Sequence, residues 1–178
     1  MSKIVPFSPV KLVIPTLTAA TEFLPRIRSE LETAFGPIDY ESRLLPFNYT
    51  EYYESEMGPD LRRIFYSIGP LFGPEQLADI KLRTDAIEKT FSVDSRRKVN
   101  LDPGVLSLSR FILATTKDHA HRIPLKGGIY AEVTLMYHKN GFEPLPWTYP
   151  DYRTPEYGEI LSVIRGIYRR QLSPTLSA

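Results

Sequence analysis

The sequence predicts an α+β fold with a mostly antiparallel sheet, in a single domain that spans residues 1–178. Its first half alternates short apolar runs with two segments of helical periodicity, and its second half is richer in strand patterns. No internal repeat and no linker divides the chain. A length of 178 residues with 42% hydrophobic residues is typical of one globular core.

The first half predicts the order strand, helix, strand, strand, helix, strand. Segment 61–68 also fits a helix by its apolar spacing, but its aromatic and β-branched residues before Gly69-Pro70 favour a strand. Pro15 indicates that the first strand ends there or lies at an edge. This order is that of a ferredoxin-like split βαβ core. The expected strands are 11–17, 38–48, 61–68 and 98–101, and the expected helices are 22–35 and 74–91.

The second half predicts an additional C-terminal β-hairpin and a closing helix. Residues 128–137 alternate apolar and polar side chains, which is typical of a half-buried strand. A turn is expected at 139–141 and a loop rich in proline and aromatic residues at 144–152. The expected strands are 106–116, 122–125 and 128–137, and the expected helix is 157–171.

The composition excludes several classes of function. Lys and Arg total 22 and Asp and Glu total 21, so the formal charge of +1 provides no general attraction to nucleic acid or anionic lipid. Without cysteine the chain has no disulfide, no thiolate nucleophile and no cysteine-ligated metal. Residues 1–15 lack the apolar core of a signal peptide, and no later stretch approaches the ~20 apolar residues of a membrane span. We therefore expect a cytoplasmic protein.

Asn100 and Asp102 are the first candidate ligand-binding residues. Both would project from one side of a strand that continued through them. Short polar side chains at such a position could bind a metal or a hydroxyl group. Asp before Pro103-Gly104 is also typical of a turn, and both interpretations stay open.

The segment that follows the strand 106–116 holds a second group of candidates. If it is extended, Lys117, His119 and His121 share one side. An anion could then be bound by Lys117, His121 and Arg122. A metal could be bound by the two histidines with the distant Glu132, but two imidazoles are too few ligands to predict a metal site. An exposed turn with solvated charges is the alternative.

Glu132 interrupts the expected strand 128–137. Strict alternation places it on the face opposite the core, together with Tyr130 and Thr134. That face could be the floor of a cleft, could face solvent, or could be paired with an arginine under the last helix. A carboxylate needs a partner group before it can act as a catalyst.

Two segments, 51–56 and 147–152, combine aromatic rings with carboxylates. Side chains such as Tyr149 and Asp151 could bind a base or a sugar, and the same composition is found in protein interfaces. Tyrosines that only edge the core are the structural alternative.

Four motifs resemble a known family. They are PFNYTEYYESEMG at 46–58, VNLDPG at 99–104, GIYAEVTL at 128–135 and TYPDY at 148–152. Together and in this order they resemble the uncharacterised prokaryotic domain-of-unknown-function family 4416 over nearly the whole chain. The resemblance implies no established activity. Some members are labelled GTP-binding protein, but the G-x-x-x-x-G-K-[ST] phosphate loop of the usual GTPases does not occur in this sequence.

Three hypotheses for the function follow from the residues. The favoured one is that a small polar ligand, such as a phosphate-bearing molecule or a nucleotide, binds in a cleft near residues 100–151. The alternatives are a protein-interaction module that uses the tyrosine-rich loops and, disfavoured by the near-neutral charge, an RNA-binding domain. No nucleophile and base can be paired, so enzymatic activity and any cofactor stay open. The candidate ligand-binding residues are Asn100, Asp102, Lys117, His121, Arg122, Glu132, Tyr149 and Asp151.

Overall fold

A computed structural model describes residues 3–50, 52–94, 96–139 and 141–173. The strands are β1 (Val10–Thr18), β2 (Ile38–Glu41), β3 (Leu45–Pro46), β4 (Arg62–Phe72), β5 (Val99–Leu101), β6 (Gly104–Leu106), β7 (Arg110–Thr115), β8 (Ile123–Pro124), β9 (Tyr130–His138) and β10 (Gly141–Pro144). The α-helices are α1 (Leu24–Phe35), α2 (Glu54–Met57), α3 (Leu77–Lys89) and α4 (Pro155–Leu172), and short 3-10 helices cover Thr21–Phe23, Pro74–Gln76 and Pro150–Arg153.

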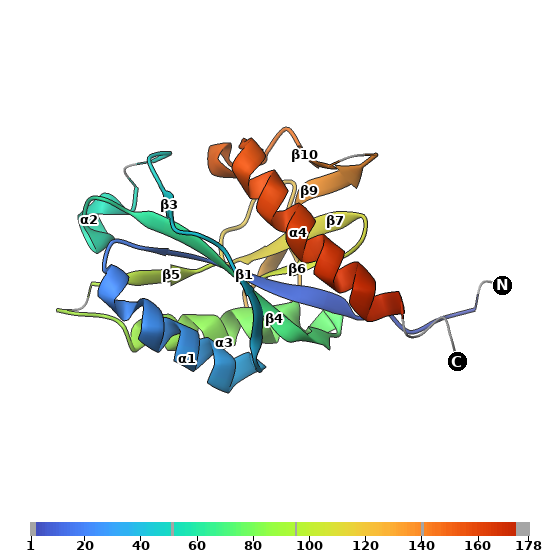
Figure 1. Cartoon of the computed structure of the whole chain (residues 1–178), viewed down its shortest axis with the longest axis horizontal. Coiled ribbons are helices and arrows are strands. Elements are labelled where there is room, and N and C mark those ends of the chain that lie inside the picture. Colours follow the sequence, from blue (N-terminus) through green and yellow to red (C-terminus); the bar gives the residue numbers. More distant parts are fainter. Residues whose placement is uncertain (1–2, 51, 95, 140, 174–178) are drawn as a thin grey trace.

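All ten described strands belong to one sheet, and every pairing among them is antiparallel. The main order is β10-β9-β7-β6-β1-β4-β2, with β3 on β4, β5 on β1 and β8 on β9. Helices α1 and α3 cover one face and α4 covers the other (Figure 1). The predicted α+β class with a mostly antiparallel sheet is therefore confirmed.

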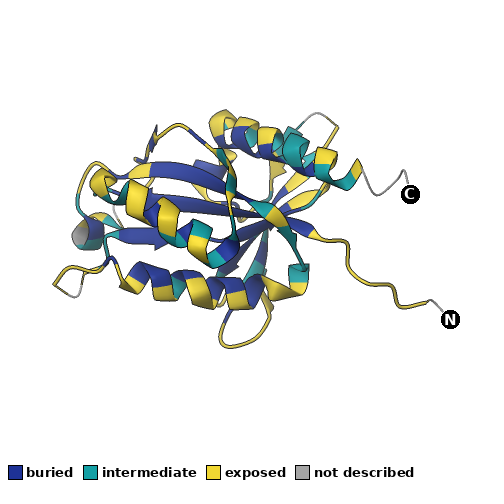
Figure 2. Ribbon diagram, turned by 60° about the horizontal axis from the view of Figure 1, so that its bottom comes forward, coloured by how far each residue is buried: buried dark blue, intermediate teal, exposed yellow. Residues whose placement is uncertain are grey.

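The two largest apolar clusters lie on the two faces of the sheet. One packs α1 and α3 against β1 and β4 through side chains such as Ile27, Ile87 and Ile64. The other packs α4 against β7 and β9 through Ile164, Phe111 and Leu135 among others. Figure 2 shows the strands buried between helices whose outer faces are exposed. The sheet is thus the middle of three layers, as apolar burial on both of its faces requires.

The strand expected at 61–68 is confirmed as part of β4, the longest strand described. The segment 38–48 forms two short strands, β2 and β3, and not one. At the break the hydroxyl of Ser42 accepts a hydrogen bond from the N–H of Phe65 at 2.9 Å, in place of a backbone carbonyl. A side chain that takes over a backbone acceptor interrupts a strand ladder.

The segment 106–116 is also divided, because a turn at 107–109 separates β6 from β7. The N–H of Ser107 donates to the carbonyl of Arg110 at 2.9 Å and closes this hairpin. β6 begins at Gly104, where a Cβ atom would lie 2.6 Å from the Phe111 ring. Strand β10 was not expected, because the sequence predicted a turn at 139–141 and a loop from residue 144. It pairs with the end of β9 and completes a C-terminal hairpin. Asn140, in the expected turn at 139–141, lies outside the described residues.

β1 is a central strand, so the expectation that Pro15 marks its end or an edge was wrong. Pro15 lies opposite the break between β5 and β6, and its carbonyl accepts a hydrogen bond from the N–H of Asp102 at 2.9 Å. In an extended strand the N–H and the carbonyl of one residue point to the same side. The missing N–H of proline therefore falls where no regular ladder exists to need it.

Lys11 of β1 is buried beside the end of α4. Lys11 is 0% exposed, and its ammonium donates to the carboxylate of Asp39, to the carbonyl of Gly69 at 3.2 Å and to the side chain of Gln171 at 2.9 Å. Burial lowers the pKa of Lys11, and the charge of Asp39 opposes this shift. These three acceptors stabilise the buried charge.

Among the described residues, no helix combines the length and apolar character that a membrane crossing requires.

Candidate functional site

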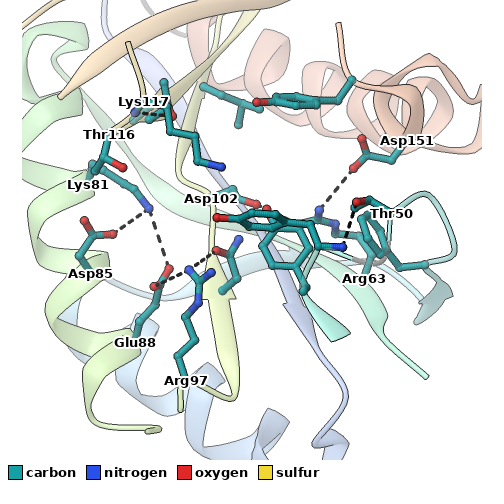
Figure 3. A pocket seen from close by; sticks show the side chains of 18 of the residues that line it. Thr50, Arg63, Lys81, Asp85, Glu88, Arg97, Asp102, Thr116, Lys117 and Asp151 are labelled. Atoms are coloured by element: carbon teal, nitrogen blue, oxygen red, sulfur yellow. Dashed lines mark hydrogen bonds and ion pairs between the residues drawn. The ribbon is translucent and has the colours of Figure 1, made fainter. Parts of the chain in front are cut away.

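The sheet forks on one side of β1. β1 pairs with β5 along residues 16–18 and with β6 along residues 11–13, and β6 then pairs with β7. Asp102 and Pro103 form the apex of the fork, where the carbonyl of Pro103 accepts from the N–H of Ala114 at 3.0 Å. A cavity of about 630 Å³ opens between the two arms, lined by Asn100 of β5 and by residues 113–115 of β7. Figure 3 shows the charged side chains that enter it.

The remaining walls come from parts of the chain far apart in sequence. They are α3, the segment 47–56, the loop after β7, and the 3-10 helix Pro150–Arg153 with the residue before it. Seven of the eight candidate residues line the cavity, and the eighth, His121, does not. Those that line it are Asn100, Asp102, Lys117, Arg122, Glu132, Tyr149 and Asp151. The structure thus brings them together, while their role stays a prediction.

Arg63 of β4 forms the floor of the cavity. Arg63 pairs with Leu17 of β1, and Leu17 pairs with Asn100 of β5 on its other side. The Arg63 side chain therefore reaches the fork across β1. Arg63 is 2% exposed and donates to Asp102 at 3.1 Å and to Asp151 at 3.3 Å. Burial raises the pKa of Asp151, while the charge of Arg63 opposes this rise. The two carboxylates neutralise a guanidinium that could not be buried alone.

Helix α3 contributes a second charged group. The Lys81 ammonium lies 2.7 Å from Asp85 and donates to the carbonyl of Leu101 at 3.0 Å. Glu88, two turns after Lys81, accepts a hydrogen bond from the N–H of Leu101 at 2.6 Å and lies 3.6 Å from Arg97. Burial raises the pKa of Glu88 to about 7, although the Lys81 charge and the Leu101 N–H oppose this. The Glu88 carboxyl therefore changes its charge near neutral pH.

Glu132 is held on the opposite wall. Its Oε2 atom accepts from Arg122 Nε at 2.7 Å and bonds to His121 Nε2 at 2.9 Å. Arg122 also donates to the carbonyl of Lys117 at 2.8 Å and to the hydroxyl of Tyr149 at 2.8 Å. Arg122 thereby ties the loop after β7, strand β9 and the segment before α4 into one wall. An arginine partner for Glu132 was one of the expected alternatives, but the arginine lies in this loop and not under the last helix.

The facing of Glu132 differs from the strict alternation expected of its strand. Phe111 pairs with Leu135 and Ile112 with Val133, which leaves Thr134 without an opposite residue. A bulge of this kind shifts the alternation by one residue. Glu132 consequently lies on the same side of the sheet as Leu135, and it is buried.

The segment after β7 is a loop and not an extended strand, so Lys117, His119 and His121 do not share one face. Lys117 and Arg122 line the cavity, whereas the His121 ring stacks outside it, 5.0 Å from Trp147 and 5.7 Å from His119. Among the described residues, no group of three or more His, Asp or Glu side chains is placed to hold a metal ion.

Aromatic residues of the segment 47–53 lie against the cations of the cavity. The Arg63 guanidinium is 5.1 Å from the centre of the Phe47 ring, and that of Arg97 is 5.7 Å from Tyr53. The Lys117 ammonium is 4.4 Å from the centre of the Tyr52 ring. Contacts of this kind orient a cation without neutralising its charge.

Four buried polar atoms of cavity-lining residues have no hydrogen-bond partner among the described residues. They are Arg63 Nε, Asn100 Nδ2, Glu132 Oε1 and the hydroxyl of Tyr152. Buried polar groups in proteins are nearly always hydrogen-bonded, because leaving one unsatisfied costs about 1–3 kcal/mol. Two donors, one acceptor and one hydroxyl of the lining therefore have no partner within the described part of the protein.

Sequence reasoning missed Arg63, Lys81, Glu88 and Arg97. Lys81 and Glu88 lie with Leu77 and Thr84 on the buried side of α3, at helical spacing. Charged residues in register with the apolar face of a helix are a signal that could have identified them. Arg63 precedes the apolar run 64–66 in a buried strand and gives a similar signal.

The fold and the cavity define a mixed α+β protein with a polar, charge-paired cavity at a fork in its sheet. The chain belongs to the family described as Domain of unknown function (DUF4416), which matches residues 8–168. The resemblance of the four sequence motifs is thus confirmed. No curated protein and no solved structure matches the chain significantly.

Proposed function

We propose that this protein binds a small polar ligand in the cavity at the fork of the sheet. The observation that carries the proposal is the set of four buried polar atoms without partners, all on residues that line one cavity. Among the described residues, six basic and six acidic side chains also line it, so the formal charges of these twelve cancel: Arg63, Lys81, Lys89, Arg97, Lys117 and Arg122 against Glu56, Asp85, Glu88, Asp102, Glu132 and Asp151. Convergent polar groups in a concave site are typical of ligand recognition.

The tyrosine-rich loops support this proposal over a protein-interaction module. Tyr52, Tyr53 and Tyr149 line the cavity, and each contacts a cation of its wall. These tyrosines, although Tyr52 and Tyr149 are exposed, thus contribute to the wall of the cavity.

We also propose that the first part of the fold is a ferredoxin-like split βαβ core. The support is the antiparallel order β5-β1-β4-β2, in which α1 follows β1 and α3 follows β4. Both helices lie on the same face of the sheet, as that arrangement requires (Figure 1). The cavity then lies at the edge where β6, β7 and β9 extend the core.

A thermal-shift screen tests the ligand proposal. The probes are nucleotides, sugar phosphates, acidic metabolites and divalent metals, each over a range of concentrations. A ligand at about 100 times its Kd stabilises the native state by about 2.7 kcal/mol. For a chain of this size that raises Tm by about 7 °C.

Two variants separate binding in the cavity from binding elsewhere. Asn100→Leu removes a buried polar group of the cavity and is expected to abolish the Tm shift. Asn48→Leu makes the same change at an exposed position that does not line the cavity, and should leave the shift intact. If both variants respond like the unmodified protein, the ligand binds elsewhere and the proposal is wrong.

A further inference from the structure

Among the described residues, two lysines that line the cavity have no carboxylate partner. Arg63, Lys81, Arg97 and Arg122 are each paired with at least one carboxylate. Lys117 has no carboxylate partner among the described residues, and Figure 3 shows its side chain pointing into the cavity. Lys89 on α3 is the other lysine without such a pair, and both lysines are exposed. Since the Lys117 side chain points into the cavity, an anionic group on the ligand would match it.

Four of the six aromatic side chains that line the cavity are already engaged, while Tyr49 and Tyr149 are exposed. Phe47, Tyr52 and Tyr53 each present a ring face to a cation of the cavity, as described above. Tyr152 packs among Phe65, Phe111 and Tyr157 in the apolar core. Nucleotide sites without sequence preference depend on free ring faces that stack on the base. This arrangement leaves few ring faces for a base and favours a ligand recognised by hydrogen bonds.

The unpartnered polar atoms offer the donors and acceptors to which hydroxyl groups can form hydrogen bonds. Asn100 Nδ2 can only donate, Glu132 Oε1 accepts, and the hydroxyl of Tyr152 does both. Asn100 and Glu132 are 4% and 2% exposed, so each is more than nine-tenths buried. A hydroxyl group also donates and accepts, so several hydroxyls on one molecule could satisfy both donors and acceptors.

We propose that the ligand is a polyol that carries one anionic group, such as a sugar phosphate or a sugar acid. Lys117 binds the anionic group, and Asn100 and Glu132 bind hydroxyls. This inference rests on the proposed function and narrows its ligand class.

Calorimetric titration with matched probes tests the class. The probes are glucose 6-phosphate, ribose 5-phosphate and gluconate, their neutral parents glucose and ribose, and inorganic phosphate, AMP and GTP. At least one anionic polyol should bind ten times more tightly than its neutral parent and than inorganic phosphate. AMP and GTP should bind more weakly than that polyol.

The variant Lys117→Gln is expected to weaken binding of the anionic polyol at least tenfold and to leave the neutral parent unchanged. Lys126→Gln removes a lysine that is paired with Asp79 outside the cavity, and should change neither affinity. Tight binding of a nucleotide without binding of any anionic polyol would overturn this inference and leave the proposed function standing. No binding of any probe, in titration and in the thermal-shift screen alike, would overturn both.

Discussion

Glu88 gives the protein a stability that depends on pH in a direction opposite to most carboxylates. Burial raises its pKa from 4.5 to about 7, with the nearby charges of Asp102 and Asp85 adding to this rise. The charge of Lys81 and the N–H of Leu101 oppose it, and Arg97 also faces the carboxyl, at 3.6 Å. Between pH 4.5 and about 7, the Glu88 carboxyl is protonated less in the unfolded chain than in the folded chain. Stability must then fall as the pH rises through this window.

The variant Glu88→Gln measures this contribution. A pKa shift of about 2.5 units corresponds to roughly 3 kcal/mol, because one unit is about 1.36 kcal/mol. Urea unfolding of both proteins between pH 4.5 and pH 8 gives the difference in their free energies of unfolding. That difference should move in favour of the glutamine variant by up to about 3 kcal/mol as the pH rises. Asp151, whose pKa is also raised, is present in both proteins and cancels.

A matched control is Glu159→Gln, which removes one carboxylate at an exposed position on α4. If the Glu88→Gln difference stays constant within about 0.5 kcal/mol across the pH range, Glu88 is an ordinary carboxylate and the reasoning from its burial is refuted.

Two further predictions concern the frame of the site. Arg63→Met leaves Asp102 and Asp151 without their shared partner and should lower the free energy of unfolding by about 3 kcal/mol. Arg43→Met breaks an exposed pair with Glu156 and should lower it by less than about 1 kcal/mol. Equal losses for the two variants in urea unfolding would contradict the role of Arg63. Gly104→Ala places a Cβ atom 2.6 Å from the Phe111 ring and should destabilise by about 1–3 kcal/mol. Gly158→Ala, in helix α4 with no atom within 4 Å of its new Cβ, should instead stabilise by up to about 1 kcal/mol, and the same sign for both changes would contradict this account.

Local patterns predicted most helices and strands of the fold. The helix expected at 74–91 corresponds to a 3-10 turn followed by α3, and the ambiguous segment 61–68 lies in β4. Patterns could not reveal the break at Ser42, because it depends on a side-chain hydroxyl bonding to a strand distant in sequence. They also misplaced Pro15, because the ladder break that tolerates it lies on β5 and β6.

The candidate site was predictable only in part, because some of its residues come from elements that are distant in sequence. Asn100, Asp102 and Lys117 follow or end strands, where polar residues stand out against apolar runs. Arg63 and Glu88 come from other elements, and only the fold shows that they meet at the fork. Glu132 was identified by its type, but its facing depends on the bulge at Thr134, which sequence alternation does not contain. The cytoplasmic location stays a prediction.

The buried ammonium of Lys11 has a consequence for where the folded unit ends. The family match stops at residue 168, yet Gln171 lies beyond it and bonds to Lys11, while its amide donates to Gly69 at 2.7 Å. A chain cut at the limit of the family match would keep the buried charge and lose one of its acceptors. The family match therefore ends before the part of α4 that supplies Gln171, an acceptor that the buried Lys11 ammonium needs.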